Sequence, residues 1–362
     1  MTMTAHLRLL NDGIPGPHPD GTRLAEPFSP QELAASPLAP ASLGFSGTGV
    51  PRPDTVWREI RPDGELRMLE CPCPGLPAPV YLAGHATSSL DAAHALIRRG
   101  ALPEWGSVLV LSQSAGRGQL RRAWASPPGN IYAALRVPAA WPLNSTAAAP
   151  ALGGLFAEAL TRMGYAVALK WPNDILQAQD EDFFRDDASP LPSGTAGNWT
   201  KVGGILLEER GGALVAGVGL NIFSAPPPSA LRDAFALPAG VLHQKARDKP
   251  DRQHAGSARR HPSGAFIPLV PLWTLLVGLI ISCYFPKNNG TEESWWPGLA
   301  QRHLAFRGCR VRLEDALPES NSGTQRSSCE GVVEGLCVSG ALRLRVRSDE
   351  QTFLGGSLIP MQ

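Results

Sequence analysis

This chain contains few cysteines and has almost no net charge. Six cysteines in 362 residues are too few for a disulfide scaffold, so we expect a reducing, cytoplasmic setting. Lys and Arg number 33 against 32 Asp and Glu, and a formal net charge of +1 gives no overall attraction to nucleic acid or to an anionic membrane. The first 11 residues lack the apolar core of a secretory signal. The close pair Cys71 and Cys73 has no histidine or second pair to complete a tetrahedral metal site.

Long apolar runs are also lacking, with one exception. Residues 265–285 carry no charge and are long enough to cross a bilayer. Pro268 and Pro271 fall in the lead-in and first turn of the expected helix, and they shorten it to about 272–285. That length is typical of a buried core helix, so we expect no membrane partner.

Glycine and proline are plentiful, but their distribution is uneven. The 38 Gly and 35 Pro coexist with an apolar fraction of 43%, which is enough for a sizeable core. Residues 1–78 are rich in Pro, Gly and Ala and are expected to form a largely irregular N-terminal extension. Polar stretches near 179–200 and 224–263 read as surface insertions, and the basic run at 245–260 as a solvated loop.

Between these stretches the pattern predicts an α+β domain over residues 79–300. A mixed or antiparallel sheet flanked by helices is expected, because helical periodicity alternates with short apolar strands and a Gly211-Gly212 hairpin. Residues 301–362 alternate short strands with turns, as in a small β-barrel. The predicted helices are 88–99 and 151–163, and the predicted strands include 107–111, 130–137, 167–171 and 202–208.

A glycine-rich loop carries the clearest chemical signal. In the run QSAGRGQLRRAW, residues 113–124, Gly116 and Gly118 allow the backbone to approach an anion, and three arginines add positive charge. The run KWPND, 170–174, places a lysine and an acid after an apolar strand. The runs KVGGILLE, 201–208, and GVGLN, 217–221, form the predicted hairpin. Taken singly, each has an ordinary structural explanation as a surface loop, bulge or turn.

Taken together and in this order, these four runs resemble the catalytic domain of biotin protein ligases. The resemblance is strong over residues 81–222 and weaker over 272–358, which is similar to that family's closing helix and C-terminal SH3-like barrel. Residues 1–78 resemble nothing that we can name, and they show no helix-turn-helix. The resemblance therefore implies a monofunctional ligase without an N-terminal DNA-binding domain and without a nucleic-acid partner.

The resemblance implies a two-step reaction. Biotin and ATP would give biotinyl-5′-AMP and pyrophosphate, and the biotinyl group would pass to a lysine of a biotin carboxyl carrier protein. Two anions must meet, so Arg117, Lys170 and Lys201 are expected to converge on one pocket, with Mg²⁺ on the ATP phosphates. Asp174 is expected to orient or deprotonate the acceptor lysine. Homodimerisation is left open.

The family's ligand contacts map onto this sequence by motif position. The implied biotin contacts are Ser88, Ser89, Leu90, Gln113, Gly116, Arg117, Lys170 and Gly204. The implied nucleotide contacts are Gly118, Gln119, Arg121, Arg122, Trp124, Asn173 and Asn221. Trp124 is assigned either to closing the loop over the adenylate or to core packing.

Three positions depart from the family pattern. Gln119 stands where the family loop carries a second arginine, Arg121 where a glycine is usual, and Leu90 where an asparagine is frequent. The first of these departures is expected to loosen retention of the adenylate, and Arg121 offers compensation.

Three other functions remain as alternatives. A lipoate ligase or octanoyltransferase of the same fold would also load a carrier lysine. A biotin-responsive repressor would require a recognition helix. A non-catalytic binding module would be free to lose Lys170 or Lys201, and both are present.

Overall fold

The computed structural model describes residues 6–16, 22–38, 56–73, 75–119, 122–179, 199–227, 237–244, 268–284, 295–319 and 327–361. Most of the two expected insertions lies outside these residues, and so does Arg121.

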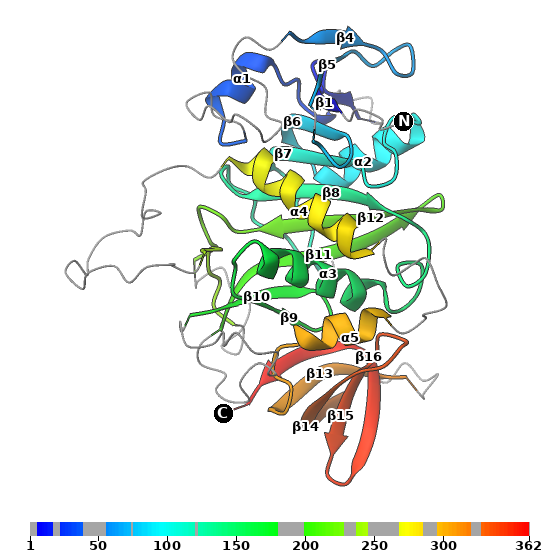
Figure 1. Cartoon of the computed structure of the whole chain (residues 1–362), viewed down its shortest axis with the longest axis vertical. Helices are drawn as coiled ribbons and strands as arrows, with labels where there is room; N and C mark the ends of the chain where they lie inside the picture. The colour runs from blue at the N-terminus through cyan, green and yellow to red at the C-terminus, as the bar shows by residue number, and fades with distance from the viewer. Residues whose placement is uncertain are drawn as a thin grey trace, which may run out of the picture.

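A mixed sheet runs through most of the molecule (Figure 1). Its order is β4 (Arg58–Ile60), β5 (Met68–Pro72), β1 (His6–Leu9), β6 (Val80–Ala86), β7 (Ser107–Gln113), β8 (Ile131–Val137), β12 (Ala213–Leu220), β11 (Trp199–Arg210), β10 (Asp174–Ala178) and β9 (Val167–Lys170). Two short strands, β2 (Ile14–Pro15) and β3 (Arg23–Ala25), join beside β6. Strand β6 is parallel to β1 and β7, while the other described pairs are antiparallel. The predicted mixed α+β class is confirmed.

The N-terminal region departs from its expected irregular structure. Strand β1 lies between β5 and β6, and its Leu7 and Leu9 are completely buried. A short helix, α1 (Pro30–Ala35), begins with a capping box between Ser29 and Glu32. Strands of two to five residues are too short for their alternation to stand out among so many prolines and glycines. The described part of residues 1–78 therefore adds strands to the large sheet.

Helices cover the two faces of the sheet separately. Tyr132 and Ala134 of β8 pack in the same buried cluster as helix α2 (Ser89–Arg98). The alternate residues Ile131 and Ala133 pack in the cluster of α3 (Ala148–Arg162) and α4 (Leu269–Tyr284). Successive side chains of this strand thus pack into two separate cores.

Helix α4 is the helix expected within the uncharged run. It begins three residues earlier than predicted, with Pro271 in its first turn, where the missing N–H has no helical partner to lose. Its Trp273 is buried, and the indole Nε1 donates to Ser107 Oγ at 2.9 Å. Within the described ranges, no helix has the length and apolarity that crossing a membrane requires.

The C-terminal strands close into a barrel of β13 (Arg310–Pro318), β14 (Ser327–Leu336), β15 (Leu342–Val346) and β16 (Asp349–Pro360). Helix α5 (Trp295–Arg302) spans the expected boundary at residue 300 and packs on α3. The barrel also contacts the KWPND turn, because Trp171 Nε1 donates to the carbonyl of Gly340 at 2.9 Å. The barrel lies at the end of the molecule next to β9 (Figure 1).

Candidate active site

A cavity of about 630 Å³ lies where the glycine-rich loop, the start of α2, the KWPND turn, the β11–β12 hairpin and the barrel meet. Polar and charged groups gather in it from segments that are distant in sequence. The predicted site residues that line it are Ser88, Ser89, Leu90, Gln113, Arg117, Gly118, Gln119, Arg122, Trp124, Lys170, Asn173, Asp174, Lys201, Gly204 and Asn221.

Glycines of β11 and β12 form part of the cavity floor. Gly204 pairs with Gly219 across β11 and β12, so the two share one face of the sheet. The indole of Trp124 lies on this pair: a Cβ added at Gly219 would come within 2.5 Å of the ring, and one added at Gly204 within 3.3 Å. Leu90 fills the space over Gly217 in the same way. The absent side chains of these strands thus leave room for the loop and helix above them.

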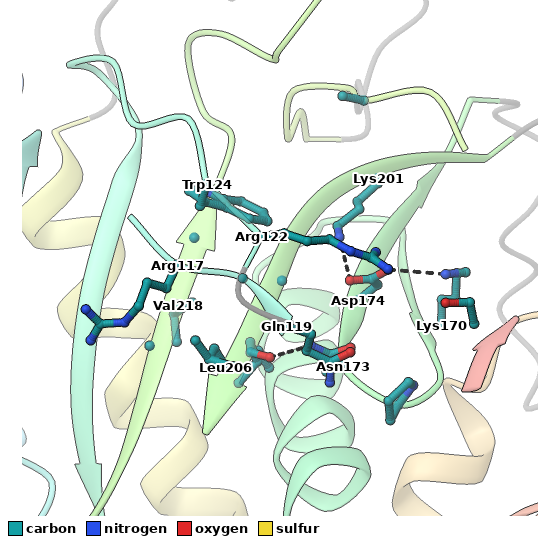
Figure 2. Close-up of a pocket in the computed structure, with 18 of the residues that line it drawn as sticks. Arg117, Gln119, Arg122, Trp124, Lys170, Asn173, Asp174, Lys201, Leu206 and Val218 are labelled. Atoms are coloured by element: carbon teal, nitrogen blue, oxygen red, sulfur yellow. Dashed lines mark hydrogen bonds and ion pairs between the residues drawn. The ribbon is translucent and has the colours of Figure 1, made fainter. Parts of the chain in front are cut away.

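Lys170, Asp174 and Lys201 form what we call the Asp174 cluster (Figure 2). Asp174 pairs directly with Lys170 across β10 and β9, and its Oδ2 lies 3.2 Å from Lys170 Nζ. Its Oδ1 lies 2.6 Å from Lys201 Nζ. The Lys201 ammonium is also 5.4 Å from the centre of the Trp124 ring, a cation–π contact. One carboxylate between two ammonium groups leaves this cluster with a surplus positive charge.

The Asp174 carboxyl is ionised at neutral pH. Burial disfavours its charged form, but the charges of Lys201 and Lys170 outweigh burial and lower its pKa below the usual 3.8. The carboxylate therefore holds both lysines in place.

Arg117 does not join this cluster. Its Nη1 and Nη2 donate to Asp91 Oδ2 and Oδ1 at 2.9 Å each, and its Nε donates to Glu208 Oε1 at 3.0 Å. Arg210 contacts the same two carboxylates, and we call these four residues the Arg117 cluster. Figure 2 shows the Arg117 side chain directed away from the Asp174 cluster. All three cations thus line one cavity, as expected, but the Arg117 guanidinium is paired with Asp91 and Glu208 and does not join the two lysines.

Three of the four amide side chains predicted to contact ligands already link the walls of the cavity to one another. Gln113 Oε1 accepts from the Ser89 N–H at 2.8 Å, and its Nε2 donates to Ser126 Oγ at 2.9 Å. Asn173 Nδ2 donates to the carbonyl of Ile205 at 2.6 Å. Asn221 Nδ2 donates to the carbonyl of Gly240 at 3.0 Å. Their positions are thus fixed before any ligand binds.

Gly116 is the one described site residue that does not line the cavity. It is buried, and its carbonyl accepts from the Trp124 N–H at 2.8 Å. A Cβ at Gly116 would meet the Trp124 carbonyl oxygen at 2.5 Å, so its role in the structure is to let the loop turn. Ser88 lines the cavity and also caps α2, its Oγ accepting from the Leu90 N–H at 3.2 Å.

Sequence reasoning missed two contributions to the site. The role of Asp91 could not be recognised from the sequence, because an acid in the first turn of a helix is already expected from its favourable interaction with the helix dipole. Glu314 and Asp315 of the barrel also line the cavity, together with residues 356–359. No local signal connects residues so far along the chain with the glycine-rich loop.

The segment that carries most of this site is similar to known proteins. Residues 86–222 match the model of the Biotin/lipoate A/B protein ligase family. The chain is 32% identical over 146 residues to a biotin--[acetyl-CoA-carboxylase] ligase of Paracoccus denitrificans, covering 37% of this chain and 51% of that protein. It is 30% identical over 228 residues to the bifunctional ligase/repressor BirA of Bacillus subtilis (strain 168), covering 57% of this chain and 62% of that protein. The chain thus spans between half and two thirds of these relatives.

Solved structures support the fold. A mutant biotin protein ligase from Aquifex aeolicus in complex with biotin superposes with a TM-score of 0.50 at 17% identity, covering 78% of this chain and 98% of that one.

Proposed function

We propose that this chain, whose residues 86–222 belong to the biotin/lipoate A/B protein ligase family, is an ATP-dependent biotin protein ligase. It would activate biotin as biotinyl-5′-AMP with release of pyrophosphate. It would then transfer the biotinyl group to a lysine of a biotin carboxyl carrier protein, which forms an amide bond. The proposal places this reaction in the cytoplasm.

The surplus positive charge of the Asp174 cluster carries the proposal. The first step brings a carboxylate against a triphosphate, and these two anions repel each other unless fixed cations lie between them. Lys170 and Lys201 supply those cations within the cavity, with 17% and 34% of their side chains exposed. Because Asp174 already holds both ammonium groups, they need little reorganisation when the anions arrive.

Asp174 would act in the second step. Its lowered pKa makes it a weak base at neutral pH, so it would orient the acceptor lysine rather than take its proton, and the ammonium group would lose that proton to water before the amine attacks. Each Asp174 carboxylate oxygen contacts one lysine, and a second lone pair would let the carboxylate accept a hydrogen bond from the incoming amine while both lysines stay in place.

Magnesium fits this site as a companion of ATP rather than as a resident of the protein. Within the described part of the chain, no group of three or more His, Cys, Asp or Glu side chains is placed to hold a metal. Mg²⁺ commonly binds through substrate phosphates and keeps several waters, and it supplies charge neutralisation there. We therefore assign no protein ligand to it.

The deciding experiment is a pyrophosphate-release assay with biotin and ATP, followed by transfer to a carrier domain. Release that depends on both substrates, and labelling of one carrier lysine, are the expected results. Calorimetric titration with biotin and with lipoate distinguishes a biotin ligase from a lipoate ligase. Tighter binding of lipoate would mean that lipoate, not biotin, is the substrate.

We also propose that the chain acts without a nucleic-acid partner, since its net charge is close to zero. Salt-dependent, sequence-specific DNA binding by the purified chain would contradict this part of the proposal.

A further inference from the structure

The Arg117 side chain ties the glycine-rich loop to two other elements. Asp91 lies in the first turn of α2, and Glu208 lies on β11. The Arg117 guanidinium donates two parallel hydrogen bonds to Asp91, and its Nε donates one to Glu208. This geometry uses the planar fork of an arginine, which a lysine cannot reproduce.

The loop itself is a small hairpin with Arg117 at its base. Arg117 and Ala123 form an antiparallel bridge, the Trp124 N–H donates to the Gly116 carbonyl at 2.8 Å, and the Gly118 N–H donates to the Arg122 carbonyl at 2.8 Å. Gln119 and Arg122, at the outer end of the described part of the hairpin, line the cavity. Fixing the base therefore fixes the direction of these two residues.

The contacts at the base are sheltered from solvent. The side chains of Asp91 and Glu208 are only 18% and 19% exposed. Hydrogen bonds to Asp91 and Glu208 raise the pKa of Arg117 further above its usual range, although burial opposes this. Arg210 reaches the same carboxylates from the more exposed rim. A partly buried, bidentate ion pair of this kind holds its geometry better than an exposed pair.

We infer that Asp91 and Glu208 are positioning residues that set the glycine-rich loop over the cavity by clamping Arg117. This inference deepens the proposed function and rests on it. The clamp orders the loop before ligand arrives, so that less conformational entropy is lost when biotin and the nucleotide bind. No group of the clamp is required to touch the reacting atoms.

Amide hydrogen exchange in the ligand-free protein tests the clamp without using activity. The variants are Asp91→Asn, Glu208→Gln and the double variant, with Glu209→Gln as the matched control for loss of one negative charge on β11. We expect the Gly118 and Trp124 amides to exchange about tenfold faster in the double variant, with the rest of the sheet unchanged. The control should exchange as wild type does. Unchanged exchange in the double variant, or faster exchange throughout α2 and the sheet, would overturn the inference.

Kinetics supply the second readout. In pyrophosphate release, the double variant should raise the KM for biotin about tenfold and keep kcat within about twofold, because the loss lies in ordering the binding wall. Asp91→Glu combined with Glu208→Gln keeps one of the two carboxylates, so its KM for biotin should lie closer to the wild-type value than that of the double variant. A fall in kcat at constant KM would overturn the inference. If the wild-type chain released no pyrophosphate, the proposed function would fail, and the exchange measurement would still decide whether the clamp orders the loop.

Discussion

The cavity is bordered by two ionic clusters that have opposite arrangements. In the Asp174 cluster one carboxylate lies between two lysines, whereas in the Arg117 cluster one guanidinium lies between two carboxylates. The first has a net positive charge, and the second, with Arg210 included, has none. Cations of similar appearance in the sequence therefore have different uses. Between these two clusters, the lysines have charge to spare for an anionic ligand, while Arg117 is committed to holding its loop.

Removing a cation from the Asp174 cluster should have the largest effect. Lys170→Ala deletes fixed positive charge where two anions meet, so we expect pyrophosphate release to fall on the order of 10³-fold. Circular dichroism and the thermal melting temperature serve as controls for the fold. Wild-type release by a folded variant would show that the reaction occurs elsewhere.

Removing the anion of the same cluster should separate the two steps of the reaction. Asp174→Asn keeps the shape of the side chain but cannot orient an ammonium group electrostatically, so transfer from preformed biotinyl-adenylate should slow about 100-fold. Adenylate formation should suffer less, because both lysines remain. Single-turnover transfer to a carrier domain measures this difference, and equal losses in both steps would contradict the assigned role.

The glycine floor between the two clusters offers a steric test. Gly219→Ala places a methyl group about where the Trp124 ring lies, and overpacking of this kind should destabilise the protein by about 2 kcal/mol. Gly204→Ala is the matched variant, with a closest approach of 3.3 Å, and it should cost less than half as much. Chemical denaturation compares them, and equal costs would mean that the indole does not rest on Gly219 in solution.

A third cluster, outside the cavity, provides a reference for an ion pair that serves only stability. Glu158 on α3 contacts His303 at 2.8 Å and Arg162 at 2.8 Å. The hydrogen bond from His303 is the main reason that the pKa of Glu158 is lowered from 4.5 to about 2, although burial opposes the shift. Its stabilisation is therefore present above pH 4.5 and is lost as the pH falls towards 2.

Glu158→Gln should accordingly destabilise the protein by about 1–2 kcal/mol at pH 6, with roughly half of that difference remaining near pH 3. Denaturant unfolding of both proteins across this range is the measurement, with pyrophosphate release expected to stay near wild type at pH 7. A difference that did not depend on pH would show that packing of the side chain, rather than its charge, is responsible.

Local signals account for most of what could be predicted. The Ser88 cap placed the start of α2, the Gly211-Gly212 pair placed the β11–β12 hairpin, and four short apolar runs gave the barrel. Each feature depends on residues that are near one another in sequence. The Lys170–Asp174 pair belongs to this class as well, because a tight turn sets Lys170 opposite Asp174, whereas Lys201 joins them from β11.

What could not be predicted depends on contacts between distant residues. Strand β1 pairs with β6 more than 70 residues later in the chain, and its four residues carry no distinctive pattern. Arg117 meets Asp91 and Glu208 at separations of 26 and 91 residues. The barrel reaches the cavity only because it packs beside the KWPND turn.

The sequence by itself therefore determined which chemical groups this protein has and which short segments present them, because caps, turns and strand alternation act over a few residues. The tertiary structure alone decided which charges are neutralised and which remain available. That distinction depends on the partners each side chain finds across the fold, and electrostatic energy depends on distance in space rather than on separation along the chain.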